Sequence, residues 1–145
     1  MSFLLNAARW ASREILRAGI RWPRLRIVDD YRDGAEAISL FLSLSGYDTQ
    51  YVLSGLEVAA AVTACPPEIV LLGTSVPRTD GFAVARQLRL DWRTRHIVIV
   101  ASMAQDEPTI RKDRIAAGFD AFCQKGGIPD SLLQLFRQMG RQDEV

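Results

Sequence analysis

The chain has 145 residues, of which 48% are hydrophobic and 24% charged, and its formal net charge is +1. These values suit a single globular domain and exclude a disordered chain. The apolar runs are far shorter than the about 20 residues of a membrane-spanning helix. Composition therefore excludes a membrane-spanning protein, a disulfide scaffold, a repeat array and a multidomain enzyme. Cys65 and Cys123 have no zinc or redox spacing, and we expect both to be small buried thiols in a reducing compartment.

The charge is unevenly distributed, because residues 1–26 contain six arginines and one acidic residue. Apolar residues in this region recur at spacings of three and four, which predicts an amphipathic helix over residues 2–19. Arg9, Arg13 and Arg17 would form one row along that helix. We expect the helix to pack on its own domain or on a second subunit. Contact with an anionic membrane surface is a weaker alternative, and nucleic-acid binding is not expected.

From residue 25 onward, short β-type runs alternate with helical patterns. This alternation, with short connections, predicts a parallel sheet with helices on both faces. The predicted strands are residues 25–28, 49–53, 69–72, 97–100 and 121–123, and the predicted helices are residues 34–45, 56–63, 80–90, 107–117 and 129–139. The chain should therefore divide into an N-terminal helix and linker (1–24), one domain (25–140) and a tail (141–145).

The residues that follow each strand are the first candidates for a functional site, because ligands of parallel sheets bind at the carboxyl ends of the strands. Asp29 and Asp30 follow the first of these strands, Gly73 follows the third, Ser102 the fourth and Lys125 the fifth. An Asp pair at a strand end is by itself commonly a turn or a helix cap. His96, the one histidine, precedes a strand and is expected to be structural or exposed.

These positions resemble the receiver domain of bacterial response regulators, the phosphoacceptor half of two-component signalling. The resemblance covers about residues 25–138. It implies a flavodoxin-like, doubly wound parallel sheet of five strands in the order 2-1-3-4-5, here with an extra N-terminal helix. The matching residues are Val28-Asp29-Asp30, Ile69 to Leu72, Pro77, Asp80-Gly81-Phe82, Ser102, Phe122 and Lys125.

In that family an Asp at the end of the third strand accepts a phosphoryl group, and the acidic pair helps to hold Mg²⁺. A lysine and a Ser or Thr contact the phosphoryl oxygens, as positioned donors do in phosphoryl transfer generally. The resemblance implies a metal site formed by Asp29, Asp30 and the backbone carbonyl of Ser75. It also implies that Ser102, Phe122 and Lys125 are the phosphoryl-contact and switch positions.

The sequence departs from the family pattern at the acceptor position, where counting back four residues from Pro77 gives Gly73. Glycine supplies neither a nucleophile nor a metal ligand, so any Mg²⁺ site should be weak. Lys125 loses the carboxylate that it would face, and we expect it to pair with Asp29 or Asp30 instead. Gly126 stands where the family usually has proline, which makes the loop after Lys125 freer.

The preferred interpretation is a degenerate receiver, not an enzyme, that acts by protein–protein contact without phosphorylation. One alternative is a phosphorylatable receiver, in which the acceptor Asp has been replaced in this chain or another residue, such as Thr74 or Ser75, accepts the group. A second alternative is a module that binds a small anion near Lys125.

The resemblance also implies a bacterial cytoplasmic location and a protein partner, either a sensor histidine kinase or a downstream regulator. A homodimer is expected through the N-terminal helix or through the face formed by residues 107–117, 121–123 and 129–139. That face should carry mixed charge suited to salt-bridged docking. Its charged residues are Arg111, Lys112, Asp113, Arg114 and Asp120.

Overall fold

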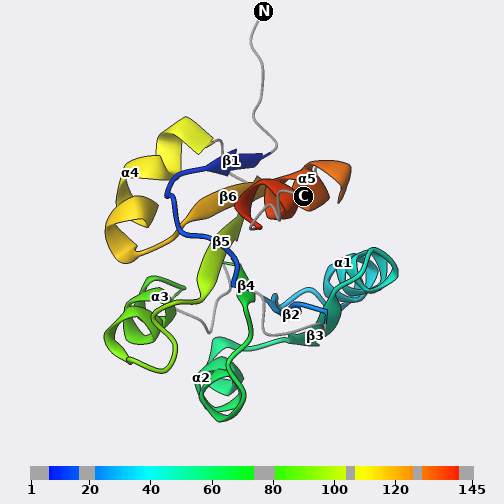
Figure 1. The fold of residues 1–145 in the computed structure, drawn as a ribbon, viewed down its shortest axis with the longest axis horizontal. Helices are drawn as coiled ribbons and strands as arrows, with labels where there is room; N and C mark the ends of the chain where they lie inside the picture. Colours follow the sequence, from blue (N-terminus) through cyan, green and yellow to red (C-terminus); the bar gives the residue numbers. More distant parts are fainter. Residues whose placement is uncertain (1–6, 17–21, 74–80, 104–106, 126–128, 141–145) are drawn as a thin grey trace, which may run out of the picture.

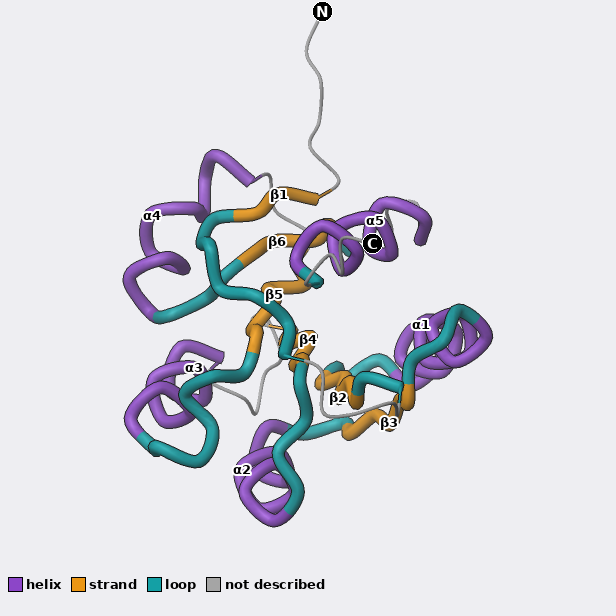
Figure 2. Tube along the Cα trace, viewed as in Figure 1, coloured by secondary structure: helices purple, strands orange, loops and turns teal. Residues whose placement is uncertain are grey.

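The computed structural model describes residues 7–16, 22–73, 81–103, 107–125 and 129–140. In this part of the chain, six strands form one sheet and five helices pack against it (Figures 1 and 2). No helix among these residues is long and apolar enough to cross a membrane. The strands are β1 (Ala7–Arg9), β2 (Arg24–Val28), β3 (Asp48–Val52), β4 (Ile69–Gly73), β5 (Val98–Met103) and β6 (Ala121–Gln124). The helices are α1 (Arg32–Leu44), α2 (Gly55–Ala64), α3 (Gly81–Leu90), α4 (Glu107–Ala117) and α5 (Pro129–Met139).

The sheet has the strand order β1-β6-β5-β4-β2-β3. Strands β2 to β6 run parallel to one another, whereas β1 pairs antiparallel with β6. The predicted order 2-1-3-4-5 of the five parallel strands is therefore confirmed, and the sheet gains a sixth, antiparallel strand at the β6 edge. Each strand and helix predicted after residue 25 is present, with small shifts of its ends.

The core consists of one layer on each face of the sheet. Figure 1 shows α1 and α5 on one face, and α2, α3 and α4 on the other. The central strand β4 serves both layers, because successive side chains of a strand point to opposite faces. Val70 and Leu72 pack in the layer under α2, α3 and α4, whereas Ile69 and Leu71 pack in the layer under α1 and α5.

The N-terminal helix predicted over residues 2–19 is wrong for the part of it that the structure describes. Ala7, Ala8 and Arg9 pair with Cys123, Phe122 and Ala121, and the chain then continues without helix through residue 16. The spacing of apolar residues in this segment suits a helix. If the segment were helical, however, β6 would be an edge strand with unpaired N–H and C=O groups. Pairing with that edge overrides local helix propensity, which is a weak determinant. The homodimer contact expected through this helix lacks its basis as well.

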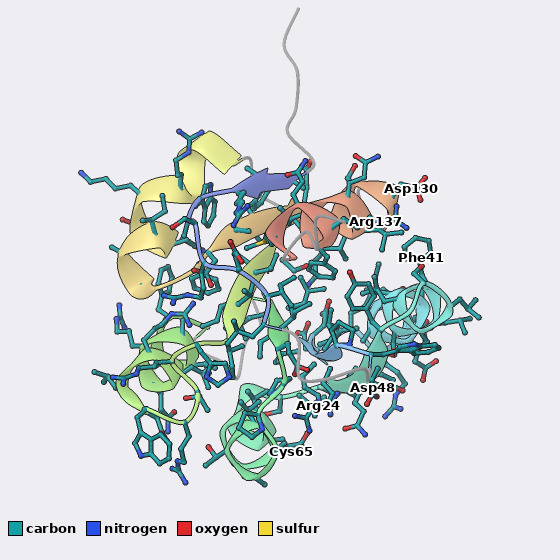
Figure 3. The ribbon with its side chains drawn as sticks, viewed as in Figure 1. Arg24, Phe41, Asp48, Cys65, Asp130 and Arg137 are labelled. Atoms are coloured by element: carbon teal, nitrogen blue, oxygen red, sulfur yellow. The ribbon has the colours of Figure 1, made fainter. Side chains whose placement is uncertain are left out.

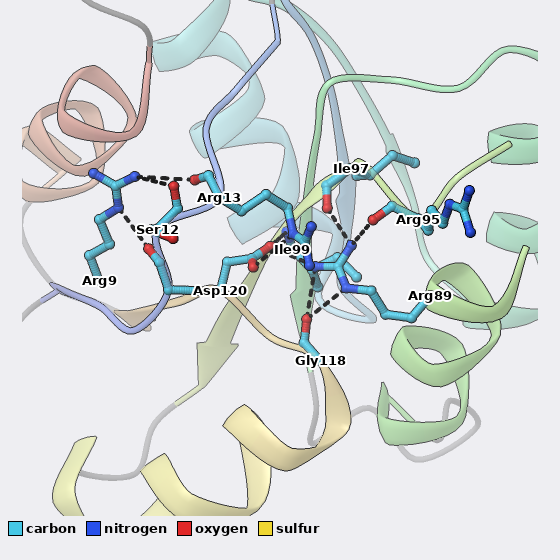
Figure 4. Close-up of polar contacts among 10 residues, drawn as sticks. Arg9, Ser12, Arg13, Arg89, Arg95, Ile97, Ile99, Gly118 and Asp120 are labelled. Atoms are coloured by element: carbon cyan, nitrogen blue, oxygen red, sulfur yellow. Dashed lines mark hydrogen bonds and ion pairs between the residues drawn. The ribbon is translucent and has the colours of Figure 1, made fainter. Parts of the chain in front are cut away.

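Asp120 was predicted to belong to a charged docking surface, and this prediction is wrong. The residue lies inside the protein and is 2% exposed. Its carboxylate accepts hydrogen bonds from Arg13 Nε at 3.0 Å, Arg89 Nη2 at 2.6 Å and the Ile99 backbone N–H at 2.9 Å (Figure 4). Arg89 also donates to the backbone carbonyl of Gly118, which follows α4. These bonds join the N-terminal segment, α3, β5 and the residue before β6.

Candidate functional site

Asp29 is the inward-facing member of the acidic pair that follows β2. Its carboxylate Oδ1 accepts a hydrogen bond from the Tyr31 backbone N–H at 3.0 Å, an Asx-type turn that leads into α1. Asp29 N–H in turn donates to the Val52 carbonyl oxygen at 3.1 Å. Asp29 is 8% exposed, whereas Asp30 is exposed to solvent. The two carboxylates therefore face different environments, and contacts within the described part of the chain hold that of Asp29 in place.

Lys125 lies just beyond β6, and both its backbone and its side-chain ammonium group are hydrogen-bonded. Its backbone N–H donates to the Met103 carbonyl oxygen at 2.8 Å, and its ammonium nitrogen lies 3.1 Å from Asp29 Oδ1. The side chains of Lys125 and Asp29 are 29% and 12% exposed. Lys125, which was predicted to pair with Asp29 or Asp30, pairs with Asp29 in the structure. Gly126, which was expected to loosen this loop, lies outside the described residues.

Gly73, Ser102 and Cys123 are neighbours across three strands. Gly73 is the buried last residue of β4 and pairs with Ser102 of β5, which pairs with Cys123 of β6. Because the strands are parallel, these positions lie at the carboxyl ends of the strands, the end of the sheet that also carries Asp29 and Lys125. Glycine gives β4 no side-chain nucleophile or ligand at its end.

Phe122 is separate from this group. It is fully buried in the layer under α3 and α4, and its ring stacks on that of Trp10, with centroids 6.0 Å apart and an interplanar angle of 20°. Ser75, expected to supply a backbone carbonyl to a metal, lies outside the described residues. Of the site residues predicted from sequence, the structure therefore brings together Asp29, Ser102 and Lys125.

These three residues line a cavity of about 300 Å³ between α1, α5 and the carboxyl ends of the strands. The rest of its lining is mostly apolar and includes Ile38 and Leu132. Tyr31 and Cys123 also line the cavity, although neither was predicted from the sequence to be a site residue. Cys123 could have been predicted at this cavity, because successive side chains of a strand point to opposite faces of the sheet and Cys123 follows Phe122.

Mg²⁺ is the metal that the resemblance implies, and the described residues make an incomplete site for it. Mg²⁺ requires near-octahedral oxygen coordination, but Asp29 already accepts bonds from Lys125 and Tyr31. Asp30 is exposed, and Gly73 offers no side-chain oxygen. Among the described residues, no group of three or more His, Cys, Asp or Glu side chains is arranged to hold a metal ion. This donor set does not fit Mg²⁺ as it stands.

The two cysteines differ in environment. Cys65 is exposed, so the expectation of a buried thiol is wrong there, and its sulfur contacts the Arg24 guanidinium (Figure 3). The short helix α2 ends at Ala64 and leaves Cys65 in the following turn, outside the core. Cys123 lines the cavity, and burial raises the pKa of its thiol to about 11.

N-Ethylmaleimide at about pH 8 is expected to modify Cys65 rapidly in the folded protein and to leave Cys123 unmodified. The thiolate is the reactive form, and a pKa of about 11 keeps Cys123 protonated at that pH. Intact mass over time, with peptide mapping, measures the two rates. A Cys65→Ser variant should show no labelling until urea unfolds the chain. Equal native rates at both thiols would contradict the raised pKa of the half-buried Cys123 thiol.

Comparison with curated proteins identifies relatives over most of this chain. It is 27% identical over 122 residues to the DNA-binding dual master transcriptional regulator RpaA of Synechocystis, covering 84% of this chain and 51% of RpaA. It is 30% identical over 119 residues to the response regulator MprA of Mycobacterium sp. strain KMS, covering 82% of this chain and 51% of MprA. The chain thus spans about half the length of these curated relatives.

Solved structures share the fold. The chemotaxis protein CheY4 of Vibrio cholerae superposes with a TM-score of 0.77 at 19% identity, over 81% of this chain and 98% of CheY4. The BeF₃-activated receiver domain of RstA from Klebsiella pneumoniae superposes with a TM-score of 0.73 at 24% identity, over 82% of this chain and 99% of that domain. The family model of the response regulator receiver domain matches residues 25–137. The chain therefore belongs to the response regulator receiver domain family.

Proposed function

We propose that this chain is a receiver domain that signals by protein contact and does not accept a phosphoryl group at the end of β4. The observation that carries the proposal is the presence of glycine at position 73, the last residue of β4. Gly73 pairs with Ser102 and lies at the same end of the sheet as the ion pair between Asp29 and Lys125. Transfer to a receiver needs a carboxylate at that place, and glycine has none.

The ion pair between Lys125 and Asp29 supports the same proposal. With the ammonium group 3.1 Å from the Asp29 carboxylate, the positive charge that would meet a phosphoryl oxygen is already compensated. A small free anion would have to compete with Asp29 for Lys125, in a cavity whose lining is mostly apolar. The pairing therefore favours a silent receiver over an anion-binding module.

The second candidate is a phosphorylatable receiver, and the grouping of Asp29, Ser102 and Lys125 around one cavity favours it. A site without phosphoryl or metal chemistry has no chemical need for these three side chains together. In this case a residue near Gly73 would accept the group in the unmodified chain. In either case we propose a partner protein of the two-component type, a sensor histidine kinase or a downstream regulator.

Incubation with acetyl phosphate and Mg²⁺, followed by intact mass measurement, tests the proposal. We expect no adduct on this protein and one phosphoryl group on a Gly73→Asp variant. In the variant, a carboxylate oxygen attacks phosphorus, the bond from phosphorus to the acetyl oxygen breaks, and acetate leaves. A Gly73→Asn variant is the matched control, because its side chain has similar size without the nucleophile.

An adduct on the unmodified chain would overturn the proposal, and peptide mapping would then distinguish Thr74, Ser75, Asp29 and Asp30 as acceptors. If Gly73→Asp also gains no adduct, the rest of the phosphoryl site has been lost as well. That outcome supports action by contact and removes the second candidate.

A further inference from the structure

Residues 7–16, here called the N-terminal arm, cover the free edge of β6. Three residues pair with β6, and the backbone N–H groups of Trp10 and Ala11 both donate to the Asp120 carbonyl oxygen, at 2.8 and 3.0 Å. The arm then passes the carboxyl end of α5, where Ile15 N–H donates to the Met139 carbonyl oxygen at 2.8 Å. Figure 1 shows β1 outermost in the sheet, between α4 and α5.

Side chains fasten the arm at four places, one of which is Ile15, 3% exposed in the core layer under α1 and α5. The Trp10 ring stacks on Phe122 of β6, and Arg13 forms an ion pair with the buried carboxylate of Asp120 at 3.0 Å. Arg9 donates to carbonyl oxygens of the arm itself and, at 3.1 Å, to that of Gln138 in α5 (Figure 4 shows the bonds within the arm). The arm is therefore anchored to the domain by contacts that do not involve the site around Gly73.

The arm is held less firmly than the strand that it covers. Its ladder comprises three residues without a β-branched or aromatic side chain, Arg9 is exposed, and the Arg13 side chain is 39% exposed. Beneath it, Ala121 and Phe122 are both fully buried. Releasing the arm would leave β6 as an edge strand with unpaired backbone groups and an uncovered aromatic ring, a template for another strand.

We propose that the arm is a removable cover of a self-association surface, and that the partner it excludes is a second copy of this chain, docked through β6. The orientation of the arm supports this choice. A two-fold axis through the sheet edge pairs two identical strands antiparallel, and antiparallel is the direction in which β1 lies on β6. A second β6 can therefore take over the backbone bonding that β1 now supplies. Arm and second copy compete for one edge, so the covered chain is monomeric and the uncovered chain dimerises.

The test uses the full chain carrying Ala8→Pro, Trp10→Ala and Arg13→Ala, which together remove ladder, ring and ion-pair contacts. Hydrogen exchange measures protection of the arm, and light scattering across a concentration series measures mass. We expect the unmodified chain to be monomeric with a protected arm. The variant should lose that protection, and its mass should rise towards that of a dimer with concentration. Arg13→Ala alone is the milder variant if the triple variant fails to fold.

A disulfide lock supplies the decisive control. Ala7 and Cys123 are partners across the antiparallel ladder and border the same core layer. Such partners lie about 4.5–5.5 Å apart between Cα atoms, within the disulfide range. Adding Ala7→Cys and Cys65→Ser to the released variant should give a monomer when oxidised and a dimer when reduced. A folded, released variant that stays monomeric would overturn the proposal, as would a dimer that persists in the oxidised form or an arm that stays protected.

Discussion

Replacing Asp120 with alanine is expected to lower the free energy of unfolding by about 3–5 kcal/mol, the range found when one partner of a buried ion pair is removed. Asp120 is 2% exposed, and the Arg89 side chain that it pairs with is 15% exposed. Burial lowers the pKa of the Arg89 guanidinium and the Asp120 carboxylate opposes that shift. Without the carboxylate, Arg89 is a buried cation with only carbonyl oxygens to bind. Urea unfolding measures the loss.

Asp91→Ala is the matched control for Asp120. Asp91 also pairs with an arginine, Arg93, at 2.8 Å, but the two side chains are 26% and 50% exposed. Water can replace that contact, so we expect a much smaller loss of stability. Adding Arg89→Met to Asp120→Ala should recover part of the loss, because it removes the unpaired cation. A loss at Asp120 no greater than at Asp91 would contradict the role assigned to the buried pair.

The parallel sheet and the ends of its strands could be predicted because their signals are local. Ile69 to Leu72 form a continuous apolar run, which indicates burial on both faces, and β4 is buried throughout. Asp29, Ser102 and Lys125 each follow such a run, so topology alone brings them to one edge of the sheet. Because Asp29 and Asp30 lie at the same end of the sheet as Lys125, they could be predicted as its two possible partners.

The N-terminal arm and the Asp120 cluster could not be predicted in this way, because their signals are distant in sequence. Residues 7–9 become a strand only because β6, more than a hundred residues later, offers an unpaired edge. Asp120 was expected at the surface, since nothing near it in sequence identifies Arg13 or Arg89 as its partners. Tertiary contacts decide both cases, and they override local propensity.

Phe122→Ala is expected to lower the free energy of unfolding by about 3–5 kcal/mol, the usual range for truncating a buried Phe. Phe122 is fully buried, so its removal leaves a cavity in the core layer under α3 and α4 as well as losing the contact with Trp10. Guanidinium unfolding measures the change. Phe82→Ala is a suitable comparison, because Phe82 is only half-buried at the edge of the same layer, and its truncation should have a smaller effect.

A double-mutant cycle of Phe122→Ala and Trp10→Ala separates the ring contact from the cavity. The stacked rings should give a coupling energy of about 0.5–1.5 kcal/mol, so the double variant should be less destabilised than the sum of the two single variants. Such coupling means that the position of the arm depends on the packing of Phe122, for which the resemblance implies a switch role. Strict additivity would mean that Trp10 merely covers β6, and that a change at Phe122 is not transmitted to the arm through this contact.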